Sequence, residues 1–103
     1  MSSNKDIPKV NAMMIIEVLG KPKEHLTETL EKISKEMSEE KDVKIVEKKI
    51  HEPKLHKESK EIFTTFMEIE IEIEPFMLSA LTFKYMPAHI EILEPEHIMM
   101  TNK

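Results

Sequence analysis

The chain has 103 residues, 15 of them basic and 20 acidic, so its formal net charge at pH 7 is -5. This length fits one domain, and the 40% of apolar residues suffices for a hydrophobic core. The absence of cysteine excludes a disulfide framework, a zinc site built on cysteine and a cysteine nucleophile. The longest apolar run, residues 12–16, is far shorter than the ~20 residues of a membrane helix, and the polar N-terminal stretch contains no secretory signal. We therefore expect a soluble, cytoplasmic protein that does not bind membranes.

A polar lead covers residues 1–9 and ends near Pro8, and a strand is predicted over residues 10–19. Apolar residues alternate along one side of this strand, which is the period of a half-buried β-strand. The other side is also apolar apart from Glu17, and this indicates a central strand of a sheet. The alternating residues are Val10, Ala12, Met14, Ile16 and Val18.

A helix is predicted to start after Gly20, with Pro22 at its first position, and to end within residues 38–41. Its apolar residues recur with the helical period and form a single buried stripe. The stripe consists of Leu26, Leu30, Ile33 and Met37, and the opposite side is charged.

A second strand is predicted over residues 43–52, with Val43 and Ile45 on one face and Val46 and Ile50 on the other. Three lysines lie among these residues, as is typical of a protected edge strand. Residues 51–60 are polar and contain Pro53, so we expect a long loop or hairpin connection there.

A third strand is predicted over residues 62–74, where apolar residues alternate with four glutamates. Antiparallel pairing with the lysine-bearing strand would relieve the repulsion among these glutamates. We expect a register that places Lys44 opposite Glu70 and Val46 opposite Glu68.

A short helix over residues 76–85 is predicted to open at Pro75 and to stop before Pro87. Its expected buried face is Met77, Ala80 and Leu81, with Phe83 or Tyr85 at the margin. A fourth strand is expected over residues 88–94, and residues 97–103 form a tail or a short fifth strand.

The order strand, helix, strand, strand, helix, strand is that of a ferredoxin-like α+β sandwich. The single domain would span residues 10–96, with a four-stranded antiparallel sheet in the order fourth, first, third, second strand. The right-handed crossover rule places both helices on one face of this sheet.

The stretch MMIIEVLGKP, residues 13–22, resembles the opening of ACT-type regulatory domains, which share this topology. In that family the first strand ends in a Gly- and Pro-containing turn that often binds an amino acid at a subunit interface. The resemblance thus implies that Gly20, Lys21 and Lys23 are candidate ligand-binding residues. The stretch PAHIEILEPE, residues 87–96, is similar to small archaeal proteins to which no activity is assigned.

The sheet face away from the helices is the first candidate for function. We expect it to present apolar residues, among them Val46 and Ile50, between glutamates. A patch of this kind usually marks an interface, so homo-oligomerisation or contact with a protein partner is predicted. The alternatives are a solvated sheet or one covered by the apolar residues 98–100. The predicted interface residues are Met13, Ile15, Phe66 and Leu93.

Other functions find little support in the sequence. An acidic sheet without arginine would repel nucleic acid, and the single glycine excludes phosphate-binding glycine-rich loops, so no cofactor is expected. His51 and His56 are candidate metal ligands, with His25 completing the site, against the simpler interpretation of surface histidines. No spacing indicates a catalytic group. The sequence thus predicts a non-catalytic module for self-association and protein contact, with an ACT-type amino-acid sensor as the alternative.

Overall fold

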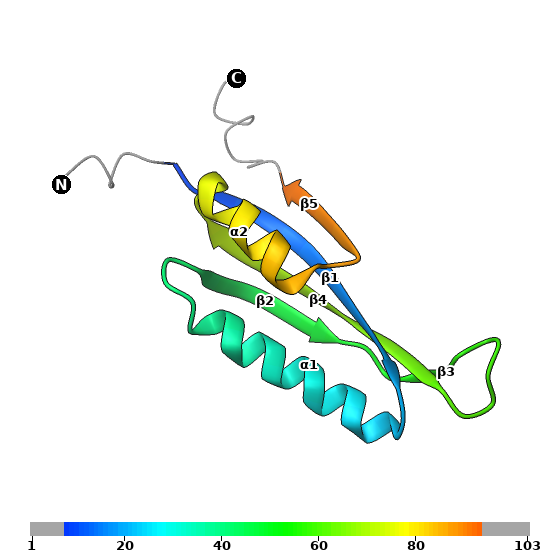
Figure 1. Ribbon diagram of the computed structural model, residues 1–103. Coiled ribbons are helices and arrows are strands. Elements are labelled where there is room, and N and C mark those ends of the chain that lie inside the picture. Colours follow the sequence, from blue (N-terminus) through cyan, green and yellow to red (C-terminus); the bar gives the residue numbers. More distant parts are fainter. Residues whose placement is uncertain (1–7, 94–103) are drawn as a thin grey trace.

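The computed structural model describes residues 8–93, which form a mixed α+β domain with two helices and an antiparallel sheet (Figure 1). The elements in chain order are β1 (Val10–Gly20), α1 (Lys23–Ser38), β2 (Lys44–Ile50), β3 (Lys54–Leu55), β4 (Phe63–Ile73), α2 (Pro75–Tyr85) and β5 (His89–Leu93). The helices and the four longer strands lie where the sequence predicts them. The two-residue β3 lies in the stretch expected to be a loop.

The sheet is built around two long strands, β1 and β4, which pair along their whole length from Val10–Ile73 to Gly20–Phe63. The strand order is β2-β4-β1-β5, with β3 beside the start of β4, and every pair is antiparallel. The four longer strands thus follow the expected order. The apolar character of both faces of β1 and the lysines of β2 correctly indicated a central strand and an edge strand.

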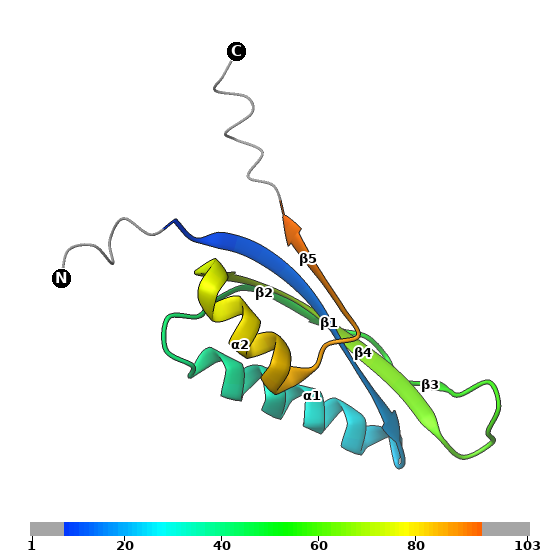
Figure 2. The ribbon, with the colours of Figure 1, turned by 45° about the horizontal axis from the view of Figure 1, so that its top comes forward.

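The hydrophobic core combines buried side chains of the sheet with side chains of the two helices, which lie beside it (Figure 2). Alternation of apolar residues along β1 and β4 places one side of each strand in this core, as predicted. Both helices contribute to the same cluster, α1 through Leu30 and Met37 and α2 through Leu78 and Leu81. The fully buried large side chains are Met14, Leu30, Met37, Met67, Ile69, Ile71 and Ile73.

Helix α1 forms because its apolar residues fall on one side at the helical period, and Leu26, Leu30 and Met37 are buried as predicted. The same side includes the buried Ser34, whose hydroxyl donates to the Glu31 carbonyl at 2.9 Å. The Ser34 hydroxyl also accepts a hydrogen bond from Lys48 Nζ of β2 at 2.9 Å. This pair of bonds satisfies a buried polar group and ties α1 to the edge strand.

The predicted register of β2 is wrong, and so is the face assigned to Ile50. Lys44 lies opposite Glu72, and the register shifts between Ile45 and Glu47, so Val46 is the extra residue of a β-bulge. One inserted residue moves all later side chains to the other face of the sheet. Ile50 therefore lies opposite Met67 and packs against the core, and half-exposed Val46 pairs with no residue of β4.

The predicted buried face of α2 is corrected at two positions, because Ala80 does not belong to it and Leu78, which was not predicted, does. Leu78 and Leu81 are buried and Met77 is half-buried, whereas Ala80 is exposed. Tyr85 packs against the core margin, and Phe83 points away from it. Apolar residues lie on every side of this helix, so the pattern alone could not distinguish its inner side from its outer side.

Neither of the two described helices is long and apolar enough to cross a membrane. The predicted tail or fifth strand over residues 97–103, and residues 1–7 of the polar lead, lie outside the residues that the structure describes.

Candidate interaction face

The sheet has a second face, opposite its core residues, which we call the open face. It carries the residues of β1, β4 and β5 that alternate with the core residues. Met13 and Ile15 of β1 and Phe66 of β4 lie on it, half-buried among their cross-strand neighbours. Leu93 of β5 lies at its edge, opposite Asn11. The structure thus brings the four predicted interface residues to one face, while Ile50 belongs to the other.

The open face includes a histidine that sequence reasoning placed in a loop. The His51 ring stacks on the Phe66 ring with centroids 4.0 Å apart and an angle of 19° between the planes. His51 Nε2 lies 3.2 Å from Glu68 Oε1, and the His51 amide donates to the Phe66 carbonyl at 3.0 Å. The hydroxyl of Thr65 donates to the His51 carbonyl. The bulge at Val46 sets the face of His51, so no local sequence signal could have shown this stacking.

Carboxylates surround the apolar centre of the open face. The open face carries six glutamates and two lysines along β1 from Asn11 to Glu17 and along the neighbouring parts of β2, β4 and β5. With neutral histidines its formal charge is -4, most of the net charge of -5 for the whole chain. The charged residues are Glu17, Glu47, Glu68, Glu70, Glu72, Glu91, Lys44 and Lys49.

A hollow of about 90 Å³ lies on this face beside Met13. Its other lining residues are Glu47, Glu68, Glu70 and Lys49, so three carboxylates meet a single ammonium group there. Liquid water occupies about 30 Å³ per molecule, so the hollow has room for a few waters or for the end of one side chain. An excess of carboxylates suits the ammonium or guanidinium end of an incoming basic residue.

The candidate ligand residues Gly20, Lys21 and Lys23 lie together in the turn from β1 to α1. Gly20 has a φ of 154°, which side chains other than glycine rarely adopt. Lys21 Nζ is 2.6 Å from Glu61 Oε1, and Lys23 is exposed at the start of α1. None of the four hollows described in this section includes these three residues.

The candidate metal ligands His51 and His56 have separate surroundings. His51 stacks on Phe66, whereas His56 Nδ1 accepts a hydrogen bond from the Glu58 amide at 3.2 Å. His25 lies on α1, with Nδ1 4.0 Å from Glu28 Oε1. Within residues 8–93, no group of three or more His, Cys, Asp or Glu side chains is placed to hold a metal ion.

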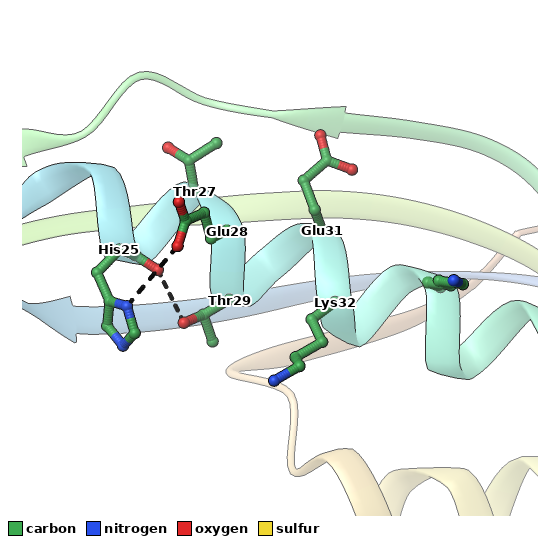
Figure 3. A pocket seen from close by; sticks show the side chains of 7 residues that line it. His25, Thr27, Glu28, Thr29, Glu31 and Lys32 are labelled. Atoms are coloured by element: carbon green, nitrogen blue, oxygen red, sulfur yellow. Dashed lines mark hydrogen bonds and ion pairs between the residues drawn. The ribbon is translucent and has the colours of Figure 1, made fainter.

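A shallow hollow of about 440 Å³ follows the outer side of α1 (Figure 3). All its lining residues belong to this one helix, and Figure 3 shows them as polar side chains such as His25, Glu28 and Lys32. The Thr29 hydroxyl in it donates to the His25 carbonyl at 2.8 Å. With no second element as an opposing wall, this surface would not enclose a small molecule.

Two further hollows lie at the margins of the sheet. One of about 650 Å³ separates α1 from β2, where Lys48 Nζ lies 3.0 Å from Glu31 Oε1. The other, of about 570 Å³, lies beside β3 and is lined by Leu19, Leu55 and charged residues. Both are open, and six of the eight residues that line each of them are polar.

Three side chains with shifted pKa values, Glu40, Lys84 and Tyr85, lie where the ends of the two helices meet. Glu40 Oε2 accepts hydrogen bonds from Lys84 Nζ at 2.6 Å and from Tyr85 Oη at 2.9 Å. The bond to Lys84 lowers the pKa of Glu40, and the same bond raises the pKa of Lys84. Burial, and then the hydrogen bond to Glu40, raises the pKa of Tyr85. This cluster joins α1 to α2, so its shifts have a structural cause.

Sequence reasoning missed the outer side of α2. Phe76 is 81% exposed and Phe83 is 83% exposed, although both are large apolar side chains. Their seven-residue separation is a signal that could have been found, because it places two side chains on the same side of a helix. These two are the most exposed large apolar side chains of the described residues, ahead of Met86 and of Leu19.

The fold and these surfaces define a small α+β domain with an acidic sheet face and, within residues 8–93, no cluster of side chains placed to hold a metal ion. The sequence matches the family model of the MJ0538 family over residues 11–103, and the chain belongs to this family. No curated protein and no solved structure matches it significantly.

Proposed function

We propose that this domain is a non-catalytic protein-contact module of the cytoplasm, and that its open face binds a lysine- or arginine-rich segment of a partner. The observation that carries the proposal is an apolar centre, Met13, Ile15 and Phe66, within a surface of formal charge -4. Aromatic and methionine side chains are typical of interface centres. Surrounding charge of one sign selects a partner of the other sign.

The same charge bears on the hypothesis that two copies associate through their sheets. Face-to-face pairing would bring two surfaces of charge -4 together, at a cost that only a large apolar contact could offset. A cationic partner gains from the same charges. The open face therefore suits a different protein better than a second copy, and it disfavours nucleic acid for the same reason.

We also infer that the domain is ferredoxin-like, with both helices on one face of the sheet. The element order and the strand order β2-β4-β1-β5 support this topology. The inclusion of Leu30 of α1 and Leu78 of α2 in one core cluster supports the helix placement. In such a fold the open face is the one that the helices leave free.

The contact hypothesis is tested by titrating the ¹⁵N-labelled chain with a synthetic peptide of alternating lysine and leucine. We expect amide shifts to concentrate around Met13, Ile15, Phe66 and Glu68. A peptide with glutamate in place of lysine should cause none, because the face is acidic. Shifts that concentrate elsewhere, or equal shifts with the acidic peptide, would contradict the proposal.

Two charge-reversal variants, one on the open face and one on α1, show whether binding depends on the open face itself. The E68K/E70K double variant should weaken binding of the lysine peptide by more than about tenfold, since both carboxylates line the small hollow. The E24K/E28K double variant makes the same change in net charge on the exposed side of α1 and should bind almost normally. If both double variants weakened peptide binding equally, binding would depend only on the net charge of the chain and not on the open face.

The alternative function, an amino-acid sensor at the turn from β1 to α1, predicts a different outcome. A bound amino acid would raise the melting temperature of the chain, because a ligand that binds only the native state stabilises it. Lys21→Ala and Lys23→Ala would abolish that rise. A panel of the twenty amino acids that leaves the melting temperature unchanged would count against this alternative and would not affect the contact hypothesis.

A further inference from the structure

Helix α2 has apolar side chains on two opposite sides. Leu78 and Leu81 point into the core, whereas Phe76, Phe83 and, immediately after the helix, Met86 are exposed. A helix that is apolar all round is normally buried all round. Within residues 8–93, no other element covers the outer side of α2.

The spacing of the exposed residues is self-complementary. Seven residues are just under two helical turns, so Phe76 and Phe83 project from the same side about 10 Å apart along the axis. Between them the exposed residues are small, Ser79 and Ala80. Large side chains at both ends and small ones at the centre form a surface that fits a copy of itself when the two helices run antiparallel.

We propose that α2 pairs with α2 of a second copy of this chain, antiparallel and about a two-fold axis near Ser79 and Ala80. In this arrangement Phe76 of each copy packs against Phe83 of the other, and the small residues allow the helix axes to approach closely. The interface is separate from the open face, so one chain can pair through α2 and still bind a partner through its sheet.

The charge distribution supports a second copy as the occupant. Lys84 is the only Asp, Glu, Lys, Arg or His residue of α2, and its Nζ is held 2.6 Å from Glu40 Oε2. The outer side of α2 is thus close to neutral in a chain of net charge -5. Two copies can join here without the repulsion that their acidic sheets would produce.

Met86 provides a second observation at the same place. Its backbone is left-handed, with φ 46° and ψ 58°, a conformation that favours glycine at the end of a helix. The position is instead occupied by a long apolar side chain that is 78% exposed, three residues beyond Phe83. A contact surface explains an apolar side chain here, where the backbone favours glycine.

The available area predicts a weak dimer. A phenylalanine side chain buries about 150–250 Å² in a well-packed contact. The four phenylalanines of two copies would therefore bury about 600–1,000 Å², which is less than the roughly 1,200–2,000 Å² of stable specific interfaces and in the range of weak, transient ones. We expect a dimer that dissociates on dilution within the micromolar range.

Sedimentation velocity of the full 103-residue chain over about a hundredfold range of concentration tests this proposal. The wild type should shift from monomer to dimer, and Phe83→Glu should raise the dissociation constant by at least about tenfold. Leu19→Glu is the matched control, because it places the same charge at another exposed apolar residue, and it should leave the dimer intact. Equal loss in both variants would overturn the proposal.

A charge pair tests the antiparallel arrangement. F76E and F83K should each weaken the dimer as single variants, whereas the F76E/F83K double variant should recover much of it, because opposite charges then face each other at both ends. Parallel helices would place like charges together, and the double variant would show no recovery.

The remaining outcomes separate this proposal from the function proposed for the sheet. Phe66→Lys should leave α2 pairing unchanged, and a dimer lost only in Phe66→Lys would overturn α2 pairing in favour of sheet-to-sheet association. A wild type that stays monomeric over the whole concentration range would also overturn it. Neither result depends on binding of the lysine peptide.

Discussion

The open face of the sheet and the outer side of α2 both expose apolar side chains, but the charge around them differs. On the open face, Phe66 lies among carboxylates and stacks on His51. On α2, Phe76 and Phe83 have only small or uncharged residues between them. Exposed apolar area thus marks both as contact surfaces, while the surrounding charge determines whether a copy of the same chain or an oppositely charged partner fits each of them.

The largest expected effect tests whether the two sides of α2 have different roles. Leu81→Ala should lower the free energy of unfolding by about 2–5 kcal/mol, because it removes a core side chain. Phe83→Ala should change it by less than about 0.5 kcal/mol in dilute solution, where the chain is monomeric. Urea unfolding followed by circular dichroism measures both. A large loss in Phe83→Ala would mean that its aromatic ring belongs to the fold of the single chain.

Salt should separate the two contact surfaces. Screening shortens the reach of charge from about 10 Å at 0.1 M salt to about 3 Å at 1 M. Over this range we expect binding of the lysine peptide to the open face to weaken by about tenfold or more. Pairing through α2 should stay constant or strengthen, because it is apolar. Peptide titration measures the first effect and sedimentation the second, in the same buffers. If salt changed both affinities equally, the two surfaces would not differ in the role of charge.

Met86→Gly should change folding and pairing in opposite directions. Glycine relieves the left-handed backbone, so the free energy of unfolding should rise by about 0.5–1 kcal/mol. The same change removes an exposed apolar side chain, so the dimer should weaken. Thermal unfolding and sedimentation of one preparation measure the two effects. Unchanged pairing would place Met86 outside the contact.

The smallest effect concerns the cluster that holds α2 against α1. Because Lys84 and Tyr85 lower the pKa of Glu40 from its ordinary value of 4.5, ionised Glu40 stabilises the fold above that value. This stabilisation is lost as the pH falls through the lowered pKa. Glu40→Gln should therefore lower the melting temperature at pH 7, and wild type and variant should converge in strong acid. If the melting temperatures still differed in strong acid, the effect of Glu40→Gln would come from altered packing or hydrogen bonding and not from the lost charge.

Much of the sheet could be predicted because strand alternation is a local property. Met67, Ile69 and Ile71 alternate with glutamates, so only one face of β4 could be buried. The same pattern placed Met13, Ile15 and Phe66 on the other face. In β2 the alternation predicted the wrong face for Ile50, because a bulge at Val46 shifts the later residues by one. No residue type in the sequence indicates this bulge.

The sequence by itself determined the order of the elements, the central place of β1, the edge position of β2 and the acidic open face, since each follows from periodicity and charge along a single segment. Only the tertiary structure decided the side of α2 that is buried, the turn of Ile50 into the core and the stacking of His51 on Phe66. These features depend on which segment lies alongside, and a helix apolar on every side shows no preference until the sheet covers one of them.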